Sequence, residues 1–496
     1  MKGCLLLQRR FAYIGHYMAK NLKEEYGVDE FCGYVYLRSS YDFLKKQTDI
    51  RYTALLLDEE IHERYKAEKV DPVYLDYLEK EFGLPNLWPY LTVDRLLMFN
   101  QLVREYPYNQ PPFTHEEMLR ILQVHAKAIL KMFEDEKPDF LFCSVVGGIG
   151  STMTWYIAKK LGIKTYIVLP TCIRNRYIIS EDPCTFTSID SKFNTLNIDA
   201  SPAKSDAMEF LEAFRSEPVP YFEKTTPTHQ PVSRKQQLKF LNPAKAMDSL
   251  TTFLKGFKRH LSSPEKKDYS YISPWNYLRD MAKRKVRNLI GNSDLYEPFD
   301  PKGDFAFFPL HYEPEAALLL QAPFYTDQIG LIRQIARSLP VRFKLVVKEH
   351  PAMAEFRPRS FYKKLKKIPN VRLINPGISG FSITPYAKLV TTITGSTGWE
   401  AVLLKKPVIS FGHQFYNSLS MVTHCHEIEG LPRLIHQKLE HHIHDDRELL
   451  GYLTAIFEDS SVFELHQLWL EENSESKKMT GVVPLADLLA KKLELI

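Results

Sequence analysis

The sequence predicts an α/β protein in which two doubly wound domains face a central cleft. Three observations support this fold class. Short apolar segments of strand length alternate with amphipathic segments of helix length, which is the pattern of parallel βαβ units. The alternation occurs in two series, separated by a stretch without strand periodicity. The chain has 496 residues, more than one ordinary hydrophobic core organises, so two domains are expected.

The first series predicts a Rossmann-like domain over residues 1–186. Its strands are expected where apolar and β-branched residues cluster, at 4–7, 30–37, 53–57, 140–146 and 164–169. Its helices are expected where apolar residues recur with a helical period, at 93–105, 115–134 and 151–161.

Residues 187–300 are predicted to form a helical, basic insertion. Residues 231–290 contain 14 Lys and Arg but only 4 Asp and Glu, a local net charge of +10, whereas the whole chain carries +5. Two helical stripes of apolar residues lie within it, at Met247, Leu250, Leu254 and Phe257, and at Leu278, Met281, Ala282, Val286 and Leu289. A basic helix with such a stripe can lie on an anionic membrane, or it can pack the stripe on the domains. No nucleic-acid recognition motif accompanies the charge, so no nucleic-acid partner is expected.

The second series predicts another Rossmann-like domain over residues 301–450. Its strands are expected at 305–309, 343–347, 371–374, 389–393 and 407–411, and its helices at 326–338, 359–367 and 398–404. Residues 451–496 are predicted to be helical and to pack back on the amino-terminal domain. Doubly wound domains bind ligands outside the carboxyl ends of their strands, so we expect the binding site between the two domains.

The composition excludes several classes of protein. The 44% apolar and 25% charged content is that of a globular chain, and the apolar runs are far shorter than the roughly 20 residues that span a bilayer. The six cysteines are scattered, which argues against a disulfide scaffold or zinc ribbon. The start "MKGCLLLQRRFAYIG" is too short and too polar for a signal peptide. We therefore expect a cytoplasmic protein, or one peripheral on the inner face of the cytoplasmic membrane.

The stretch "VTTITGSTGWEAVLLKKPVISFG" contains the strongest motif. Gly395 and Gly398 follow a predicted strand and let the backbone turn close to a ligand. Ser396 and Thr397 offer hydroxyls and amides at a helix N-terminus, where an anion such as phosphate is favoured. Glu400, one turn further, could accept hydrogen bonds from a ribose diol. The alternative interpretation is an ordinary helix-capping turn.

A second predicted strand ends in polar residues, in "KLVVKEHP". Pro351 ends the strand, and His350 can donate a hydrogen bond to a phosphate. Lys348 either adds a positive contact or pairs with Glu349. We expect this strand to neighbour the one before the 395–398 turn, so that both polar ends meet at one edge of the sheet. The alternative is a loop terminator with an incidental histidine.

Together these motifs resemble a known family. "KEHP" followed by "GSTGWEAVLLKKPVISFG" and "QFY" is similar to the capsule polysaccharide biosynthesis family, which includes bacterial Kdo transferases that use CMP-Kdo. The resemblance is best over residues 305–416. It implies a GT-B glycosyltransferase fold and a CMP-activated sugar as co-substrate, with no other cofactor and no metal. It also implies that His350 and the Ser396–Thr397 turn contact the CMP phosphate. The product would be a capsule or lipopolysaccharide-type surface glycan carrying Kdo or a related acidic sugar.

A third strand end, in "FFPLHYEPEAALL", supplies candidates for the transfer chemistry. Glycosyl transfer needs a base that deprotonates the acceptor hydroxyl. His311, Glu313 and Glu315 are expected to emerge into the cleft and are the candidate catalytic residues. The alternative is that Glu313 to Glu315 only cap the following helix.

Candidate acceptor-binding residues lie in the amino-terminal half. Gly147 and Gly148 follow a strand in "CSVVGGIGSTMTW", but they lack both the dinucleotide fingerprint and a P-loop, so NAD and ATP are not expected. Arg9, Arg10 and Arg174 each follow a strand and could meet an anionic glycan or lipid-linked acceptor, although surface salt bridges are an alternative. The histidines between residues 424 and 444 show no recurring ligand spacing and predict no metal site.

Other functions fit parts of the pattern. A CDP-glycerol-type polymer transferase has a comparable His-Pro loop and Ser-rich turn, and a nucleotide-sugar epimerase has a related two-domain fold. A non-catalytic glycan-assembly protein, recruited to a membrane surface by the basic segment, is a third alternative.

Overall fold

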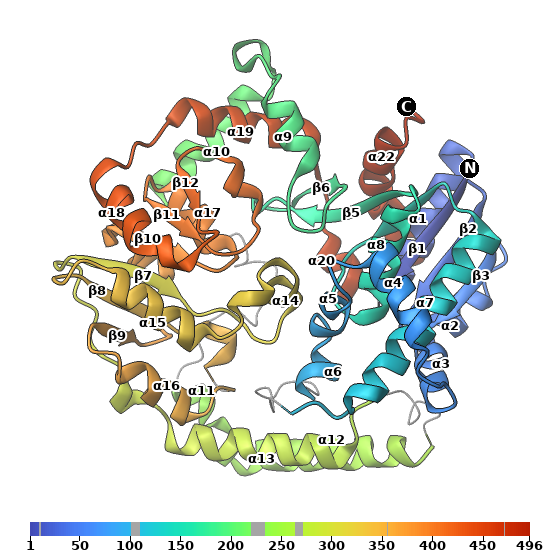
Figure 1. The fold of residues 1–496 in the computed structure, drawn as a ribbon, viewed down its shortest axis with the longest axis horizontal. Helices are drawn as coiled ribbons and strands as arrows, with labels where there is room; N and C mark the ends of the chain where they lie inside the picture. Colours follow the sequence, from blue (N-terminus) through green and yellow to red (C-terminus); the bar gives the residue numbers. More distant parts are fainter. Residues whose placement is uncertain (9–10, 101–109, 220–233, 263–270, 355, 471) are drawn as a thin grey trace.

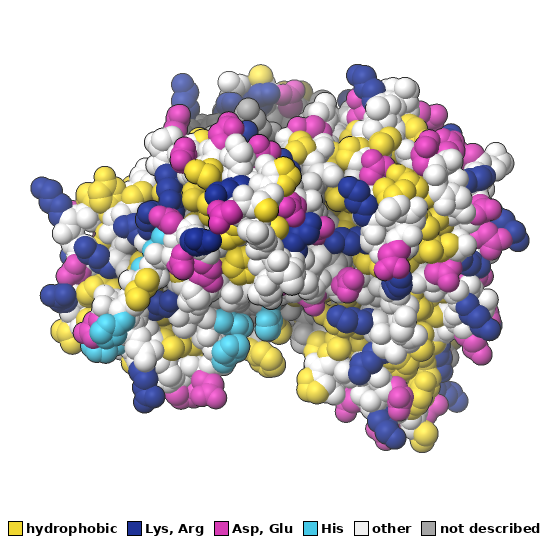
Figure 2. Space-filling view, turned by 90° about the horizontal axis from the view of Figure 1, so that it is seen from above, with side chains coloured by type: hydrophobic (Ala, Val, Ile, Leu, Met, Phe, Trp, Pro, Cys, Tyr) yellow, Lys and Arg dark blue, Asp and Glu magenta, His cyan; other side chains and the backbone are white. Residues whose placement is uncertain are grey.

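The computed structural model describes the chain except for residues 9–10, 101–109, 220–233, 263–270, 355 and 471. Two sheets, each covered by helices, lie side by side and form two Rossmann-like domains (Figure 1). The predicted α/β fold of GT-B type is therefore confirmed. Figure 2, which views the molecule from above, shows a notch at its lower edge between the left and right halves.

The sheet of the amino-terminal domain has seven strands in the order β13-β6-β5-β4-β1-β2-β3. β1 to β5 are parallel, whereas β6 runs antiparallel to β5 and β13 antiparallel to β6. The sequence does not predict β6 or β13. The strands are β1 (Lys2–Leu7), β2 (Glu30–Val35), β3 (Arg51–Leu57), β4 (Phe140–Cys143), β5 (Lys164–Pro170), β6 (Arg176–Ser180) and β13 (Ser461–Val462).

Helices cover both faces of this sheet because side chains alternate along each buried strand. In β1, Leu5 and Leu7 enter the core cluster beneath α1 and α22, while Cys4 and Leu6 enter the cluster beneath α7 and α8. The helices up to β5 are α1 (Phe11–Tyr26), α2 (Arg38–Lys45), α3 (Asp58–Glu63), α4 (Pro72–Phe82), α5 (Trp88–Thr92), α6 (Arg95–Phe99), α7 (His115–Glu136) and α8 (Ile149–Lys160).

The helix predicted at residues 93–105 is shorter in the structure. Asp94 caps its start by accepting hydrogen bonds from the amides of Leu96 and Leu97, so α6 begins at Arg95. Asn100 has a left-handed φ of 48°, which ends the helix. Residues 101–105 of the predicted helix lie outside the described residues.

The sheet of the carboxyl-terminal domain has six strands, all parallel, in the order β12-β11-β10-β7-β8-β9. The two strands that carry the polar motifs, β8 and β10, end at the same edge of the sheet. They were predicted to be neighbours, but β7 lies between them. The strands are β7 (Phe305–Pro309), β8 (Lys344–Lys348), β9 (Val371–Ile374), β10 (Leu389–Thr392), β11 (Val408–Ser410) and β12 (Val422–His424). The helices are α14 (Ala316–Gln321), α15 (Gln328–Ser338), α16 (Arg359–Lys366), α17 (Ser396–Leu403), α18 (Leu431–His441) and α19 (Asp446–Asp459).

The segment between the two sheets divides into two parts. α9 (Thr187–Phe193) and α10 (Lys204–Ser216) place Ile189, Leu211 and Phe214 in a core cluster with α17 and α19 of the carboxyl-terminal domain. The start of the predicted insertion is thus part of that domain's core, because its apolar residues need burial. The second part contains α11 (Arg234–Gln237), α12 (Pro243–Ser262) and α13 (Pro274–Ile290). α12 and α13 run beneath both sheets in Figure 1.

The end of the chain returns to the amino-terminal domain. α19 still lies on the carboxyl-terminal domain, so the predicted boundary at residue 451 falls inside this helix. After it, β13 joins the first sheet and three helices place apolar residues in the core cluster of α1. These helices are α20 (Leu465–Leu470), α21 (Glu475–Gly481) and α22 (Val483–Lys492). Among the described residues, no helix has the length and hydropathy of a membrane span.

Candidate functional site

The candidate site lies where β7, β8 and β10 end. The residues that follow β7 connect the other two strand ends. His311 Nε2 lies 3.0 Å from the amide nitrogen of Thr394 and 3.2 Å from Thr392 Oγ1, which ties the end of β7 to that of β10. The ring of Tyr312 has its centroid 6.0 Å from the ring of His350, beyond β8. The polar ends of the three strands therefore gather at one edge of the sheet.

The conformation of the turn before α17 leaves the N-terminus of this helix partly exposed. Gly395 has φ 95° and ψ 174°, a conformation that a residue with a Cβ rarely adopts. The Tyr416 hydroxyl donates a hydrogen bond to the carbonyl of Gly395, at 2.9 Å. A Cβ on Gly398 would lie 2.4 Å from the same hydroxyl, so only glycine fits against this fully buried tyrosine. Ser396 and Thr397 are partly exposed at the first turn of α17, where unpaired amides favour an anion.

His350 is held in one orientation by its own backbone. It caps the short 3₁₀ helix Pro351–Met353, and its Nδ1 accepts a hydrogen bond from the amide of Ala352 at 3.2 Å. In the neutral ring, the hydrogen therefore resides on Nε2. Pro351 occupies the first helical position, where its missing N–H costs no hydrogen bond. The arrangement lets His350 donate from Nε2.

Lys348 and Glu400 place two ionisable groups beside the turn. Lys348 is buried, and burial lowers the pKa of its ammonium to about 8, against the attraction of Glu349 and Glu400. Burial likewise raises the pKa of Glu400 to about 7, although the Ser396 hydroxyl and Lys348 oppose the shift. The site therefore holds a base and an acid that both change charge close to neutral pH. A bound anion would favour the charged form of Lys348.

Replacing Glu400 by Gln is expected to remove a pH dependence of stability. The folded protein holds a proton on Glu400 that the unfolded chain releases between the ordinary glutamate pKa of 4.5 and the folded value of about 7. This proton stabilises the fold at low pH, and the contribution is lost as the pH rises through 7. Glu400→Gln should therefore match wild type near about pH 4, below the unfolded pKa, and be about 1–3 kcal/mol more stable near about pH 8. Urea unfolding at both pH values measures the difference, with Glu24→Gln as control. A gain of equal size at both pH values would contradict the prediction.

Glu313, predicted as a candidate catalytic base, lies in an ion-pair network with Arg357. Its carboxylate lies 3.0 Å from Arg357 Nε and accepts a hydrogen bond from Gln328 Nε2 at 2.6 Å. Arg357 is fully buried, also pairs with Glu349 and donates to the carbonyl of His311 at 2.6 Å. A carboxylate held in a buried ion-pair network is bound to its cation and is shielded from an acceptor. Glu313 instead joins the strand ends of β7 and β8.

His311 also has a supporting position. Its Nε2 is engaged with the 392–394 backbone and side chains, and burial lowers the pKa of the ring to about 4. Its Nδ1 is buried and has no hydrogen-bond partner among the described residues. Through these contacts, His311 ties the end of β7 to the turn before α17.

Glu315 is the candidate base that faces the cleft. It is exposed and lines a cavity of about 250 Å³ between the domains, together with Gly147 and Gly148. Desolvation of its carboxyl group by the surrounding protein raises the pKa, and the attraction of Arg95 opposes this shift. Such a shift moves a carboxylate toward the range in which it can exchange a proton with a hydroxyl substrate.

The glycines predicted to bind an acceptor lie on the amino-terminal side of this cavity. A Cβ on Gly147 would lie 2.6 Å from Cβ of Ala316, so the two domains touch at this point. Gly148 precedes α8, and the Asp94 carboxylate accepts a hydrogen bond from the amide of Ile149 at 3.1 Å. The N-terminus of α8 is therefore already occupied by a carboxylate, which disfavours an anion at this position.

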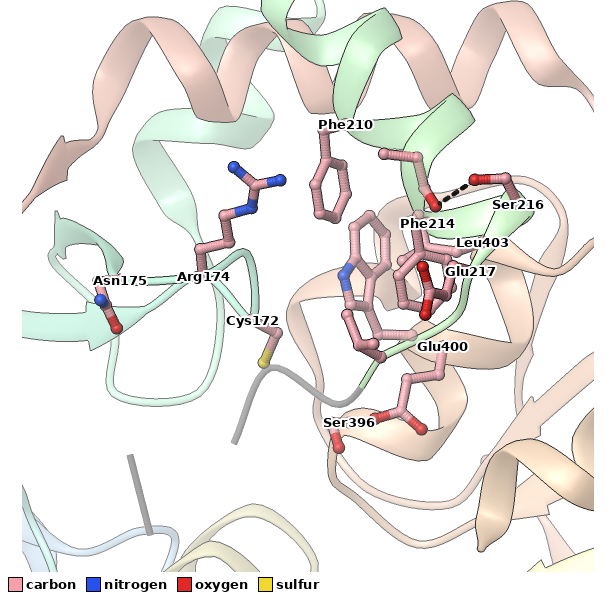
Figure 3. Close-up of a pocket in the computed structure, with 13 residues that line it drawn as sticks. Cys172, Arg174, Asn175, Phe210, Phe214, Ser216, Glu217, Ser396, Glu400 and Leu403 are labelled. Atoms are coloured by element: carbon pink, nitrogen blue, oxygen red, sulfur yellow. Dashed lines mark hydrogen bonds between the residues drawn. The ribbon is translucent and has the colours of Figure 1, made fainter. Parts of the chain in front are cut away.

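A larger cavity of about 700 Å³ lies between residues of α10, α17 and the loop after β5 (Figure 3). Ser396 and Glu400 form one wall, and Arg174 of the amino-terminal domain forms another. The loop that carries Arg174 is strained, because Cys172 and Arg174 have left-handed φ values of 59° and 45°. Such strain is characteristic of ligand-binding loops. One predicted acceptor residue and two predicted donor residues thus share a cavity.

The walls of the larger cavity also contain polar groups that the fold leaves unpaired. Within the described part of the chain, Arg174 makes no ion pair and the buried Nε1 of Trp399 has no hydrogen-bond partner. Phe210 and Phe214 of α10 form the apolar wall. An apolar cavity with a few convergent polar groups is the common form of a small-molecule site.

Some predictions are not placed by the structure. Arg9 and Arg10, predicted to bind the acceptor, lie outside the described residues. Across the described ranges, no group of three or more His, Cys, Asp or Glu side chains is placed to hold a metal ion.

Several cavity residues were missed by the sequence analysis. Gln8, Tyr36 and Asp58 directly follow β1, β2 and β3 and line the 250 Å³ cavity, so the rule used for the second domain would have found them. Phe210 and Trp399 carry no comparable signal, because their role depends on how α10 packs across α17.

Comparisons with known protein families match the second half of the chain better than the first. A family model described as "Capsule polysaccharide biosynthesis protein" matches residues 198–430, from α10 through β12, which confirms the predicted resemblance over these residues. Protein FixF of Sinorhizobium fredii is 28% identical over 184 residues, which are 35% of this chain and 44% of FixF, so the match spans less than half of that protein.

Among solved structures, the β-Kdo 2,7 transferase KpsC of Thermosulfurimonas dismutans is similar with a TM-score of 0.36 and 13% identity, covering 72% of this chain and 89% of that one. The UDP-GlcNAc 2-epimerase of Neisseria meningitidis is similar with a TM-score of 0.28 and 12% identity, covering 100% of both chains.

Proposed function

We propose that this chain, whose residues 198–430 match the capsule polysaccharide biosynthesis family, is a glycosyltransferase that moves an acidic sugar such as Kdo from a CMP-activated donor to a surface glycan. The acceptor would be a capsule or lipopolysaccharide-type chain, free or lipid-linked. The observation that carries the proposal is that His350, Lys348 and the Ser396–Thr397 turn occupy one edge of the sheet, beside a cavity that reaches the other domain.

The donor's phosphate would lie against the first turn of α17. The amides and hydroxyls of Ser396 and Thr397 would bind its oxygens, and Nε2 of His350 would donate to it. Lys348 would become fully charged beside this anion and would stabilise the negative charge that CMP gains as the leaving group. Glu400 lines the larger cavity and would accept hydrogen bonds from the ribose diol. The 700 Å³ volume lies within the range typical of cofactor-sized ligands.

The acceptor would approach from the amino-terminal domain. Arg174 would attract an acidic glycan, and Gly147 and Gly148 would let the sugar come close to the backbone. Glu315 would accept the proton of the attacking hydroxyl, since it is the one catalytic candidate of the sequence that lines the interdomain cavity. His311 and Glu313 would hold the donor turn and the strand ends in place.

Replacing Glu315 by Gln is expected to slow sugar transfer without weakening donor binding. Removal of a general base typically costs about 10²–10⁴-fold in turnover. Turnover and donor affinity are measured separately, the second by calorimetry with CMP. Glu313→Gln should instead lower stability, because it breaks the pair with buried Arg357. The control Glu24→Gln, at an exposed position, should change neither turnover nor donor affinity. Unchanged turnover in Glu315→Gln would contradict its assignment.

The proposed reaction is tested by offering the protein four donors. CMP-Kdo, CMP-sialic acid, CDP-glycerol and UDP-GlcNAc are incubated with glycan acceptors and the products are analysed. We expect CMP release and a lengthened glycan with a CMP-sugar. Polymer formed from CDP-glycerol, or epimerised UDP-GlcNAc, would replace the proposal by one of these activities. No turnover of any donor by a CMP-binding protein would favour a non-catalytic assembly role.

A further inference from the structure

The helices α12 and α13 form a pair with a large exposed apolar surface. Phe253 and Phe257 of α12 contact Trp275 of α13, with ring centroids 6.2 and 5.9 Å apart, so the apolar sides of the two helices meet. Around this contact, large apolar side chains stay between 43% and 65% exposed. They are Met247, Leu250, Leu254, Leu261, Trp275, Leu278, Val286, Leu289 and Ile290. Contiguous exposure on this scale is unusual for a surface that meets only water.

α13 faces the protein with its polar side. Arg287 donates a hydrogen bond to the carbonyl of Phe356 at 2.6 Å, and the guanidinium of Arg284 lies 5.5 Å from the centroid of the Phe356 ring. Asp280 and Asn288 are buried, while Leu278 and Val286 point away and remain exposed. An amphipathic helix of a globular protein normally has the opposite orientation. Packing of this stripe on the domains, the alternative in the sequence analysis, is therefore wrong.

The charge around the apolar surface indicates what covers it. Lys255 and Lys258 are exposed on α12, and Lys258 shares a helix face with Leu254 and Leu261. Residues 231–290 have 14 Lys and Arg but only 4 Asp and Glu. On the face seen in Figure 2, in contrast, basic and acidic side chains are interspersed over both halves. A symmetric contact with a second copy would bring two of these basic surfaces together.

We propose that the α12–α13 pair docks on an anionic lipid surface, with its apolar stripe in the headgroup region and its lysines at the phosphates. Leu, Val and Trp side chains partition into the interface, and each lysine near an anionic membrane adds favourable electrostatic energy. The docking goes beyond the proposed function, because it needs neither donor nor acceptor. It would bring the interdomain cavities to the surface that carries a lipid-linked acceptor, and this consequence alone rests on the proposed function.

Vesicle flotation tests the docking. The full chain, without any nucleotide, is mixed with vesicles of phosphatidylcholine alone or with added phosphatidylglycerol. We expect flotation only with the anionic vesicles, and release at high salt because screening weakens the attraction. Leu278→Ser with Val286→Ser, and separately Lys255→Glu with Lys258→Glu, should each lower the bound fraction about tenfold or more. Val341→Ser and Lys80→Glu, both at exposed positions outside α12 and α13, should float like wild type.

Three results would overturn the proposal. Wild type that stays unbound, or that binds neutral vesicles equally well, excludes an anionic lipid partner. A wild-type dimer in sedimentation that Leu278→Ser with Val286→Ser converts to monomer assigns the surface to a second copy instead. CMP binding by this double variant, measured by thermal shift, separates the docking proposal from the proposed glycosyltransferase function. We expect the variant to bind CMP like wild type although it no longer floats. A chain that floats but does not bind CMP loses the proposed donor and keeps the docking surface.

Discussion

Arg357→Met is expected to destabilise the carboxyl-terminal domain by about 3–5 kcal/mol, because it leaves two buried carboxylates without their cation. Arg357 pairs with Glu313 and Glu349, and its side chain is fully buried. Tyr362 donates a hydrogen bond to the other oxygen of Glu349, so the carboxylate cannot turn toward water. The loss of stability is measured by urea unfolding, from the unfolding transition of the carboxyl-terminal domain.

The control for this variant is an arginine that makes an exposed ion pair. Arg342 lies 3.3 Å from Asp304, but its side chain is 78% exposed, so Arg342→Met should cost less than about 1 kcal/mol. Neutralising the carboxylates as well, with Glu313→Gln and Glu349→Gln, should recover part of the stability, since the cost arises from unpaired charge. Equal losses in Arg357→Met and Arg342→Met would show that the network contributes no more than a surface pair.

The network also determines how well the sequence could predict the site. Strand ends could be predicted, because an apolar run that stops at His350–Pro351 or at the Gly395 turn has a local signature. The burial of Glu313 could not, because its cation is 44 residues away and no local pattern links them. The order of β7, β8 and β10 could not be predicted either, since apolar runs identify strands but not their neighbours.

The helices show a second limit of sequence patterns. The stripe at Leu278 and Val286 was visible in the sequence, but a stripe does not tell which side of a helix faces the protein. That side is set by Phe356, which lies in the turn before α16 and contacts Arg284 and Arg287. Likewise, α10 was assigned to the basic insertion because strand periodicity is absent from residues 187–300. In the structure, Leu211 and Phe214 of α10 belong to the core of the carboxyl-terminal domain.

His350→Ala is expected to weaken CMP binding about ten- to a hundredfold, corresponding to about 1.5–3 kcal/mol for a hydrogen bond to a charged phosphate. The hydrogen bond from Ala352 to Nδ1 orients the ring for donation from Nε2, so the loss should come from a single contact. The variant should keep the stability of wild type within about 1 kcal/mol, since His350 lies in a partly exposed loop. His436→Ala, at a 66% exposed histidine, is the matched control.

Calorimetric titration of wild type, His350→Ala and His436→Ala with CMP and UMP is the most direct test that the strand ends form a CMP-sugar site. We predict that wild type and His436→Ala bind CMP more tightly than UMP, and that His350→Ala loses most of its affinity for CMP. Wild type that prefers UMP, or His350→Ala that binds CMP as tightly as wild type, would contradict the account.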